Sequence, residues 1–140
     1  MALTLPLAAE QLIPHRLPMR LVDRLLEITG KNGVVEALVA ADCPLVSADG
    51  RLEDAALTEL LAQSYAAVKG YCDLRDGQPA KQGFLVGIKK IVKLQSARRG
   101  DRLEIHIKTL AQLDGFAVAE GEIWLDKQML ARGEIKVWVH

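Results

Sequence analysis

One segment of the chain, residues 54–69, has neither proline nor glycine and is apolar on most of its sides. This composition predicts one long helix, with Asp54 as its N-cap and Gly70 as its C-terminal stop. Few polar residues interrupt the segment, which is typical of a buried helix. The rest of the chain therefore has to wrap around it. Apolar side chains recur at helical spacing along one stripe of this helix: Leu57, Leu61, Tyr65, Val68 and Cys72.

Outside this segment the hydrophobic pattern changes to period two, which is typical of strands. A helical turn is predicted over residues 8–12 and an irregular stretch over 14–18. The pattern and the turn residues then predict strands over 19–28, 33–41 and 83–95, a strand that begins at 103, a strand that ends at Trp124, and a last strand over 129–139. Helix and strands are segregated, so the predicted class is α+β with an antiparallel sheet, in a single domain over residues 1–140. One helix leaves an edge or a face of such a sheet uncovered, so we expect at least a dimer.

Composition excludes several classes of function. Lys+Arg and Asp+Glu are equal at 18 each, so no overall positive field would hold a nucleic acid. The two cysteines, Cys43 and Cys72, have no zinc-ligand spacing, and no pair of histidines has it either, so we expect no metal. No apolar run approaches the roughly 20 residues of a membrane span, and the start lacks the basic region of a signal peptide. We therefore expect a soluble, cytoplasmic protein.

Three motifs resemble one known family. Residues 12–27 read Leu-Ile-Pro-His-Arg-Leu-Pro-Met-Arg-Leu-Val-Asp-Arg-Leu-Leu-Glu, which resembles the opening of the FabZ- and FabA-like 3-hydroxyacyl-ACP dehydratases. Residues 59–63, Glu-Leu-Leu-Ala-Gln, are similar to the central helix of that family, and residues 99–103 carry its Gly-Asp turn. The similarity spans residues 11–138. It implies the hotdog fold, in which an antiparallel sheet wraps around one long central helix.

The loop before the helix departs from this family. FabZ-type enzymes carry a Gly-His-Phe-Pro-Gly loop there, and its histidine is their catalytic base. Residues 44–54 of this chain contain no histidine. The Ala-Asp-Gly sequence at 48–50 is similar to the ApeP-like branch of the family, dehydratase-like proteins associated with aryl-polyene gene clusters.

The resemblance implies candidate catalytic residues. Dehydration of a 3-hydroxyacyl thioester needs a base for the C2 proton and an acid for the departing hydroxyl, and in the family these come from different subunits. Glu59 matches the family's acid; the alternative is that it faces solvent at the start of the helix. Gln63, a candidate substrate-binding residue, lies one turn on, within reach of a hydrogen bond to Glu59. By alignment Asp49 lies nearest the missing histidine and is the candidate second carboxylate; the alternative is an ordinary Asp-Gly turn.

Further residues are candidates for substrate binding. The backbone N–H groups of Ala55 and Ala56, at the helix N-terminus, are candidate donors to an enolate-like oxygen. His15 belongs to the best-matching motif, where it either contacts substrate or shapes the loop. By analogy with the family, Phe84 and Leu85 would line an acyl tunnel; otherwise they are core residues. His106 alternates with apolar neighbours and should face outward, and His140 is the last residue.

These observations favour a dehydratase-like protein that acts on an acyl-ACP or acyl-CoA thioester without a cofactor. Two alternatives remain open. The chain is a non-catalytic subunit that binds an acyl chain or assembles with a related hotdog subunit, as a homodimer or a heteromer, or it is a hotdog thioesterase. The absent histidine favours the non-catalytic subunit, and the retained pair Glu59 and Gln63 favours an enzyme.

Overall fold

A computed structural model describes residues 3–79, 83–113 and 115–139; for residues 83–86, 88, 89 and 139 only the backbone is described. Within these residues no helix is both long and apolar enough to cross a membrane. The elements are β1 (Leu7–Ala8), a 3-10 turn (Ala9–Gln11), β2 (Arg24–Thr29), β3 (Asn32–Leu38), α1 (Asp54–Arg75), β4 (Gly83–Lys93), β5 (Arg102–Leu113), β6 (Phe116–Leu125) and β7 (Gln128–Val139).

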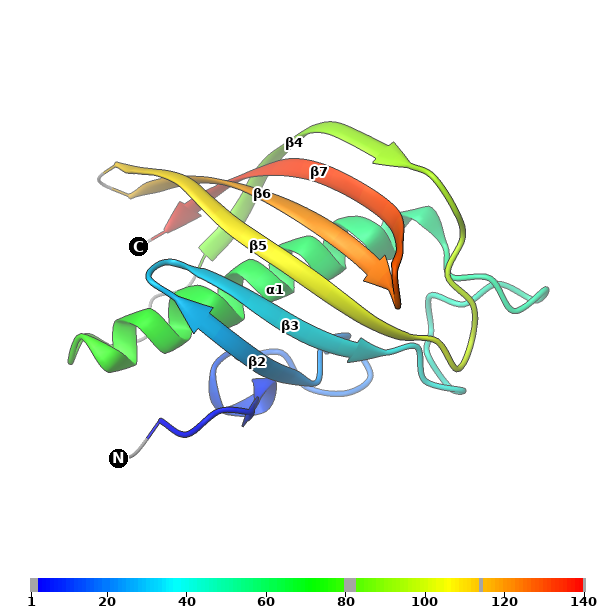
Figure 1. Cartoon of the computed structure of the whole chain (residues 1–140), viewed down its shortest axis with the longest axis horizontal. Helices are drawn as coiled ribbons and strands as arrows, with labels where there is room; N and C mark the ends of the chain where they lie inside the picture. The colour runs from blue at the N-terminus through cyan, green and yellow to red at the C-terminus, as the bar shows by residue number, and fades with distance from the viewer. Residues whose placement is uncertain (1–2, 80–82, 114, 140) are drawn as a thin grey trace.

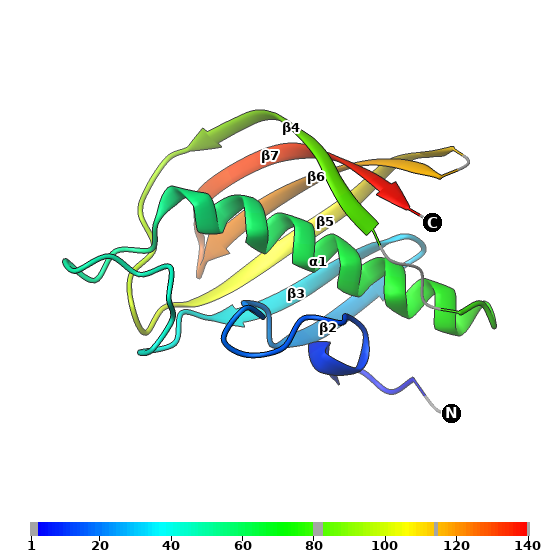
Figure 2. The same ribbon diagram turned by 180° about the vertical axis from the view of Figure 1, so that it is seen from behind.

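The strands form one antiparallel sheet that curves around α1, as Figure 1 and the reverse view in Figure 2 show. Its order is β1-β2-β3-β5-β6-β7-β4. Along β5, Leu103, Ile105 and Ile107 are buried while their neighbours are exposed, so one face of the sheet packs on the helix. This is the α+β hotdog arrangement that the sequence predicts. Strand β4 is one edge of the sheet and pairs only with β7 within the described chain.

Glycines in the sheet let α1 approach it closely. A Cβ atom at Gly121 would lie 2.5 Å from Cδ2 of Leu61, and one at Gly133 would lie 3.4 Å from Cδ1 of the same side chain. Likewise, a Cβ at Gly33 would lie 2.8 Å from Cγ2 of Val68. Leu61 therefore fills the space that the neighbouring strands β6 and β7 leave free, and Val68 fills the space at β3. These contacts hold the helix at a fixed height and register above the sheet.

The helix is longer than predicted. It continues through Gly70 to Arg75. The glycine admits the N-terminal segment rather than ending the helix, since a Cβ at this position would lie 2.5 Å from the carbonyl oxygen of Leu12. The N-cap is Glu53 rather than Asp54, which is the first helical residue and pairs with Lys93 at 2.6 Å. The predictions of a stop at Gly70 and a cap at Asp54 were therefore wrong.

The first long strand is shorter than predicted, and an additional strand precedes it. Residues 19–23 lie outside β2, which begins at Arg24. The reason is that the backbone groups of Met19 and Leu21 bond to a helix side chain rather than to a neighbouring strand. The predicted turn at 8–12 is present as the 3-10 turn, and β1 precedes it. Leu113 and Phe116 pair at the end of β5 and the start of β6.

We predict that Gly70→Ala lowers the free energy of unfolding by about 1–3 kcal/mol, because the new methyl group would collide with a backbone carbonyl. Helix propensity alone would instead stabilise the chain by about 1 kcal/mol, so the sign of the change is informative. Urea unfolding measures it, with Gly87→Ala as control because no atom lies within 4 Å of its added Cβ. A Gly70→Ala chain as stable as the wild type would contradict this packing.

Candidate active site

The amide of Gln63 joins the helix to the N-terminal segment. Gln63 is 1% exposed. Its Oε1 accepts a hydrogen bond from the backbone N–H of Leu21 at 2.8 Å, and its Nε2 donates to the carbonyl oxygen of Met19 at 2.9 Å. Nε2 also donates to Oε2 of Glu59, at 2.9 Å. Both amide N–H groups are thus used, which leaves neither for the substrate that the sequence predicts Gln63 to bind.

The carboxylate of Glu59 is the group that this amide orients. Glu59 lies in the second turn of α1, is half-buried, and has Oε2 bonded to Gln63 as the sequence predicts. Its Oε1 has no hydrogen-bond donor among the described residues, so one oxygen remains available to a ligand while the other fixes the rotamer. A carboxylate that is held at one oxygen and free at the other is suited to proton transfer.

The first turn of α1 supplies backbone donors. Ala56 donates its N–H to the carbonyl oxygen of Glu53 at 3.0 Å, so it is not free for a substrate. Within the part of the chain that the structure describes, the N–H groups of Asp54 and Ala55 have no acceptor. The side chain of Ala55 is exposed, which leaves access to its N–H. Of the two predicted donors, Ala55 keeps this capacity and Ala56 does not.

Asp49 is placed as a turn residue. Its carboxylate accepts hydrogen bonds from the hydroxyl of Ser47 and from the backbone N–H of Arg51, the latter at 3.2 Å, and it pairs with the Arg51 guanidinium at 3.6 Å. The hydrogen bond from Ser47, followed by the one from Arg51, lowers the pKa of Asp49 below its ordinary value. Its side chain is 61% exposed. This geometry argues against Asp49 as the base, because a base near neutral pH requires a raised pKa.

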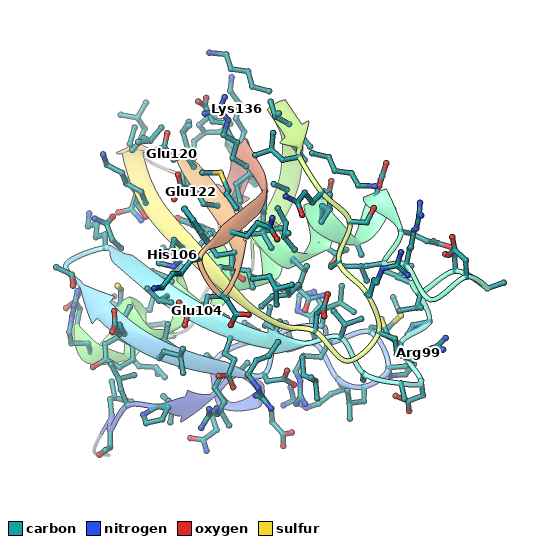
Figure 3. The ribbon with its side chains drawn as sticks, turned by 45° about the vertical axis from the view of Figure 1, so that its right-hand side comes forward. Arg99, Glu104, His106, Glu120, Glu122 and Lys136 are labelled. Carbon is teal, nitrogen blue, oxygen red and sulfur yellow. The ribbon has the colours of Figure 1, made fainter. Side chains whose placement is uncertain are left out.

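The remaining candidates fall outside this cluster. His15 is half-buried; its Nδ1 has no partner among the described residues, and its carbonyl oxygen accepts from Arg16. His106 faces outward from β5, as predicted. Its Nε2 lies 3.4 Å from Oε1 of Glu104 (Figure 3). His140 and the side chains of Phe84 and Leu85 lie outside the described residues; the backbones of Phe84 and Leu85 belong to β4. The described residues contain no cluster of three metal-ligating side chains.

Comparison with known proteins identifies the family. The family model described as ApeP-like, ApeP dehydratase, matches residues 7–140. This chain belongs to the ApeP-like dehydratase family. It is 30% identical over 125 residues to the 3-hydroxyacyl-[acyl-carrier-protein] dehydratase FabZ of Alkaliphilus metalliredigens, covering 86% of this chain and 83% of the relative. The FabZ of Clostridioides difficile is 26% identical, with 90% of each chain covered. The protein is therefore dehydratase-like, as the sequence motifs indicate.

Solved structures confirm the fold of this ApeP-like protein. A chain of the dehydratase heterocomplex ApeI:P from Xenorhabdus doucetiae matches with a TM-score of 0.87 at 23% identity, covering 94% of this chain and 90% of that chain. A hypothetical thioesterase with coenzyme A from Streptococcus pneumoniae matches with a TM-score of 0.65 at 15% identity, covering 83% and 84%. Both show the hotdog fold that the sequence predicts.

Sequence reasoning missed the backbone groups that complete the site. It did not connect residues 19–21 with the helix, because a strand was expected over 19–28. One signal was present: a glutamine on a helix that is otherwise apolar must find polar partners, and Glu59 can satisfy only part of its amide. Residues 19–21 provide the rest.

We predict that Gln63→Leu lowers the free energy of unfolding by about 1–3 kcal/mol, since it leaves the Leu21 N–H and the Met19 carbonyl without their partner. Amide hydrogen exchange at Leu21 should accelerate in the same variant. Glu59→Gln is the matched control and should change stability by less than about 0.5 kcal/mol, because the residue is partly exposed. Unchanged protection of Leu21 in Gln63→Leu would contradict the assigned role.

The pKa of Asp49 provides a second test. We expect a carboxyl-carbon NMR titration to give a pKa below the ordinary value in the wild type, and a value closer to the ordinary one in Ser47→Ala, which lacks the principal donor. Because the folded pKa is lowered, ionised Asp49 stabilises the fold above its unfolded pKa, and this contribution is lost as pH falls through the folded pKa. A raised pKa in the wild type would restore Asp49 as a candidate base.

Proposed function

We propose that this chain is one subunit of a dehydratase that acts on 3-hydroxyacyl thioesters carried by an acyl-carrier protein or coenzyme A. It supplies the carboxyl group of Glu59 to a composite active site, and a second hotdog subunit supplies the base. The observation that carries the proposal is the held carboxyl of Glu59 in a chain whose loop before α1 has no histidine. The FabZ relatives, named for 3-hydroxyacyl-ACP dehydration, support the substrate class.

The reaction is an elimination of water. The base of the second subunit removes the C2 proton, and the electron pair forms the C2–C3 double bond as the C3–O bond breaks. Glu59 gives a proton to the departing hydroxyl, which leaves as water. The free N–H of Ala55 at the start of α1 is a donor for the thioester oxygen, on which negative charge develops. Gln63 holds Glu59 in one rotamer throughout.

A second subunit fits the architecture. Strand β4 is an edge of the sheet, and an edge strand of 11 residues offers a row of backbone groups to another strand. The similar chain from Xenorhabdus doucetiae comes from a dehydratase heterocomplex, which supports a heteromer with a related hotdog subunit. A homodimer of this chain would place no histidine in either copy of the loop before α1. The heteromer is for that reason the assembly that we propose.

We predict that the chain alone does not dehydrate a 3-hydroxyacyl thioester, whereas its complex with a histidine-bearing hotdog subunit does. In that complex, Glu59→Gln should lower kcat by about 10²-fold or more, because a general acid contributes about 10²–10⁴-fold. Formation of the conjugated enoyl thioester, followed by ultraviolet absorbance, is the measurement.

Asp49→Asn is the control in the same complex and should keep wild-type kcat, because Asp49 belongs to an exposed turn. Full activity of Glu59→Gln would reduce this chain to a non-catalytic partner. Release of free thiol from the thioester, in place of enoyl product, would identify a thioesterase and overturn the proposal.

A further inference from the structure

A groove lies between the N-terminal segment and the residues that follow β3. It has a volume of about 220 Å³ and separates residues 17–23 from residues 38–44. Its lining is mainly apolar, and a smaller pocket that shares Leu21, Leu38 and Cys43 continues below it to the core residues Leu52, Leu60 and Leu103. Leu17, 72% exposed, and Leu38, 40% exposed, border the opening.

Arg20 brings hydrogen-bond donors to this groove. Its side chain lines the groove and is only 13% exposed. Nη1 pairs with Glu10 at 3.0 Å, but Nε is enclosed and, among the described residues, neither Nε nor Nη2 has an acceptor. A largely buried guanidinium normally has partners for its N–H groups. An incoming acceptor would therefore meet an unmatched donor.

Asp23 brings an acceptor to the same groove. Its Oδ2 accepts from the backbone N–H of Leu38 at 2.6 Å, and Oδ1 has no donor within the described part of the chain. The unmatched groups of Arg20 and Asp23 are thus one donor and one acceptor of opposite charge. A neutral group with one acceptor and one donor, such as a secondary amide, matches this pair. The apolar lining is suited to the methylene and methyl groups beside such an amide.

Leu21 connects the groove with Glu59. It lies in the wall of the groove, and its backbone N–H donates to Gln63, which holds the Glu59 carboxylate. Leu60, the neighbour of Glu59, lines the pocket below. A molecule whose reacting end lies at Glu59 could therefore place a flexible tail across this wall and into the groove.

We propose that the groove binds the amide-containing pantetheine arm that links an acyl thioester to its carrier. Arg20 donates to the oxygen of its outer amide, the one farther from the sulfur, and Asp23 accepts from an N–H of that amide. This inference rests on the proposed function, since it takes the thioester at Glu59 as its starting point. It assigns to Arg20 and Asp23 the recognition of the arm, separate from the chemistry at Glu59.

Binding of S-ethyl pantetheine to the full chain, alone and in its heteromer, tests the proposal. This thioether cannot be cleaved, so the measurement is independent of turnover. S-ethyl N-acetylcysteamine, which has the same sulfur end without the outer amide, is the comparison ligand. We expect Arg20→Leu to weaken binding of the pantetheine compound by about tenfold or more, as expected for loss of a hydrogen bond to a charged donor. Affinity for the shorter compound should not change.

Two controls separate the groove from other effects. Glu10→Gln removes the ion pair of Arg20 but keeps its guanidinium, and Arg99→Leu removes an exposed arginine in the turn before β5 (Figure 3). Both should bind like the wild type. Saturating S-ethyl pantetheine should also slow alkylation of Cys43, which lines the groove, and leave the buried Cys72 unaffected.

Equal affinity of the wild type and a folded Arg20→Leu for S-ethyl pantetheine would overturn the proposal, as would no protection of Cys43. Glu59→Gln should bind the compound like the wild type. If Glu59→Gln loses turnover but binds the compound unchanged, the result supports the proposed chemistry at Glu59 independently of the groove. An intact dehydratase with no binding in the groove would refute this inference alone.

Discussion

A helix that is enclosed on most sides has no free surface on which to carry polar groups, and α1 satisfies this constraint by two kinds of contact. Glycines at positions 121 and 133 of the sheet admit Leu61 on one side, and Gly70 admits the carbonyl of Leu12 on another. Gln63, one of the polar side chains buried on this helix, has its amide bonded to Met19, Leu21 and Glu59. The contacts that bury the helix therefore also position the carboxylate of Glu59.

The pattern of the sequence was sufficient for the architecture but not for its boundaries. Period-two strands and one segment without proline or glycine predict the sheet and the helix correctly. The helix end was wrong because Gly70 is required by a neighbouring backbone rather than by a C-cap. The strand start was wrong because Gln63, 42 residues from Leu21, takes the hydrogen bond that a strand would have made. Both errors arise from contacts between distant segments, which local propensity does not contain.

In the site, too, the sequence predicts the local contacts but not those that depend on the folded chain. Local spacing predicts the bond between Glu59 and Gln63, since they are one helical turn apart. It cannot distinguish a base from a turn residue at Asp49, because that depends on the donors Ser47 and Arg51 in a folded loop. With Asp49 engaged in this turn, the described residues offer the oriented carboxyl of Glu59 and no candidate base beside it. The half-site that we propose for this chain in a dehydratase is compatible with its membership in the ApeP-like family.

The most direct test of this account is a crystal structure of the chain in complex with a histidine-bearing hotdog subunit and a non-cleavable 3-hydroxyacyl pantetheine analogue. The account predicts that the free oxygen of Glu59 lies within hydrogen-bond distance, about 2.6–3.2 Å, of the 3-hydroxyl, with the partner's imidazole facing C2 of the same ligand. A ligand bound far from Glu59, or an imidazole and a Glu59 carboxylate that serve different ligands, would contradict the composite site.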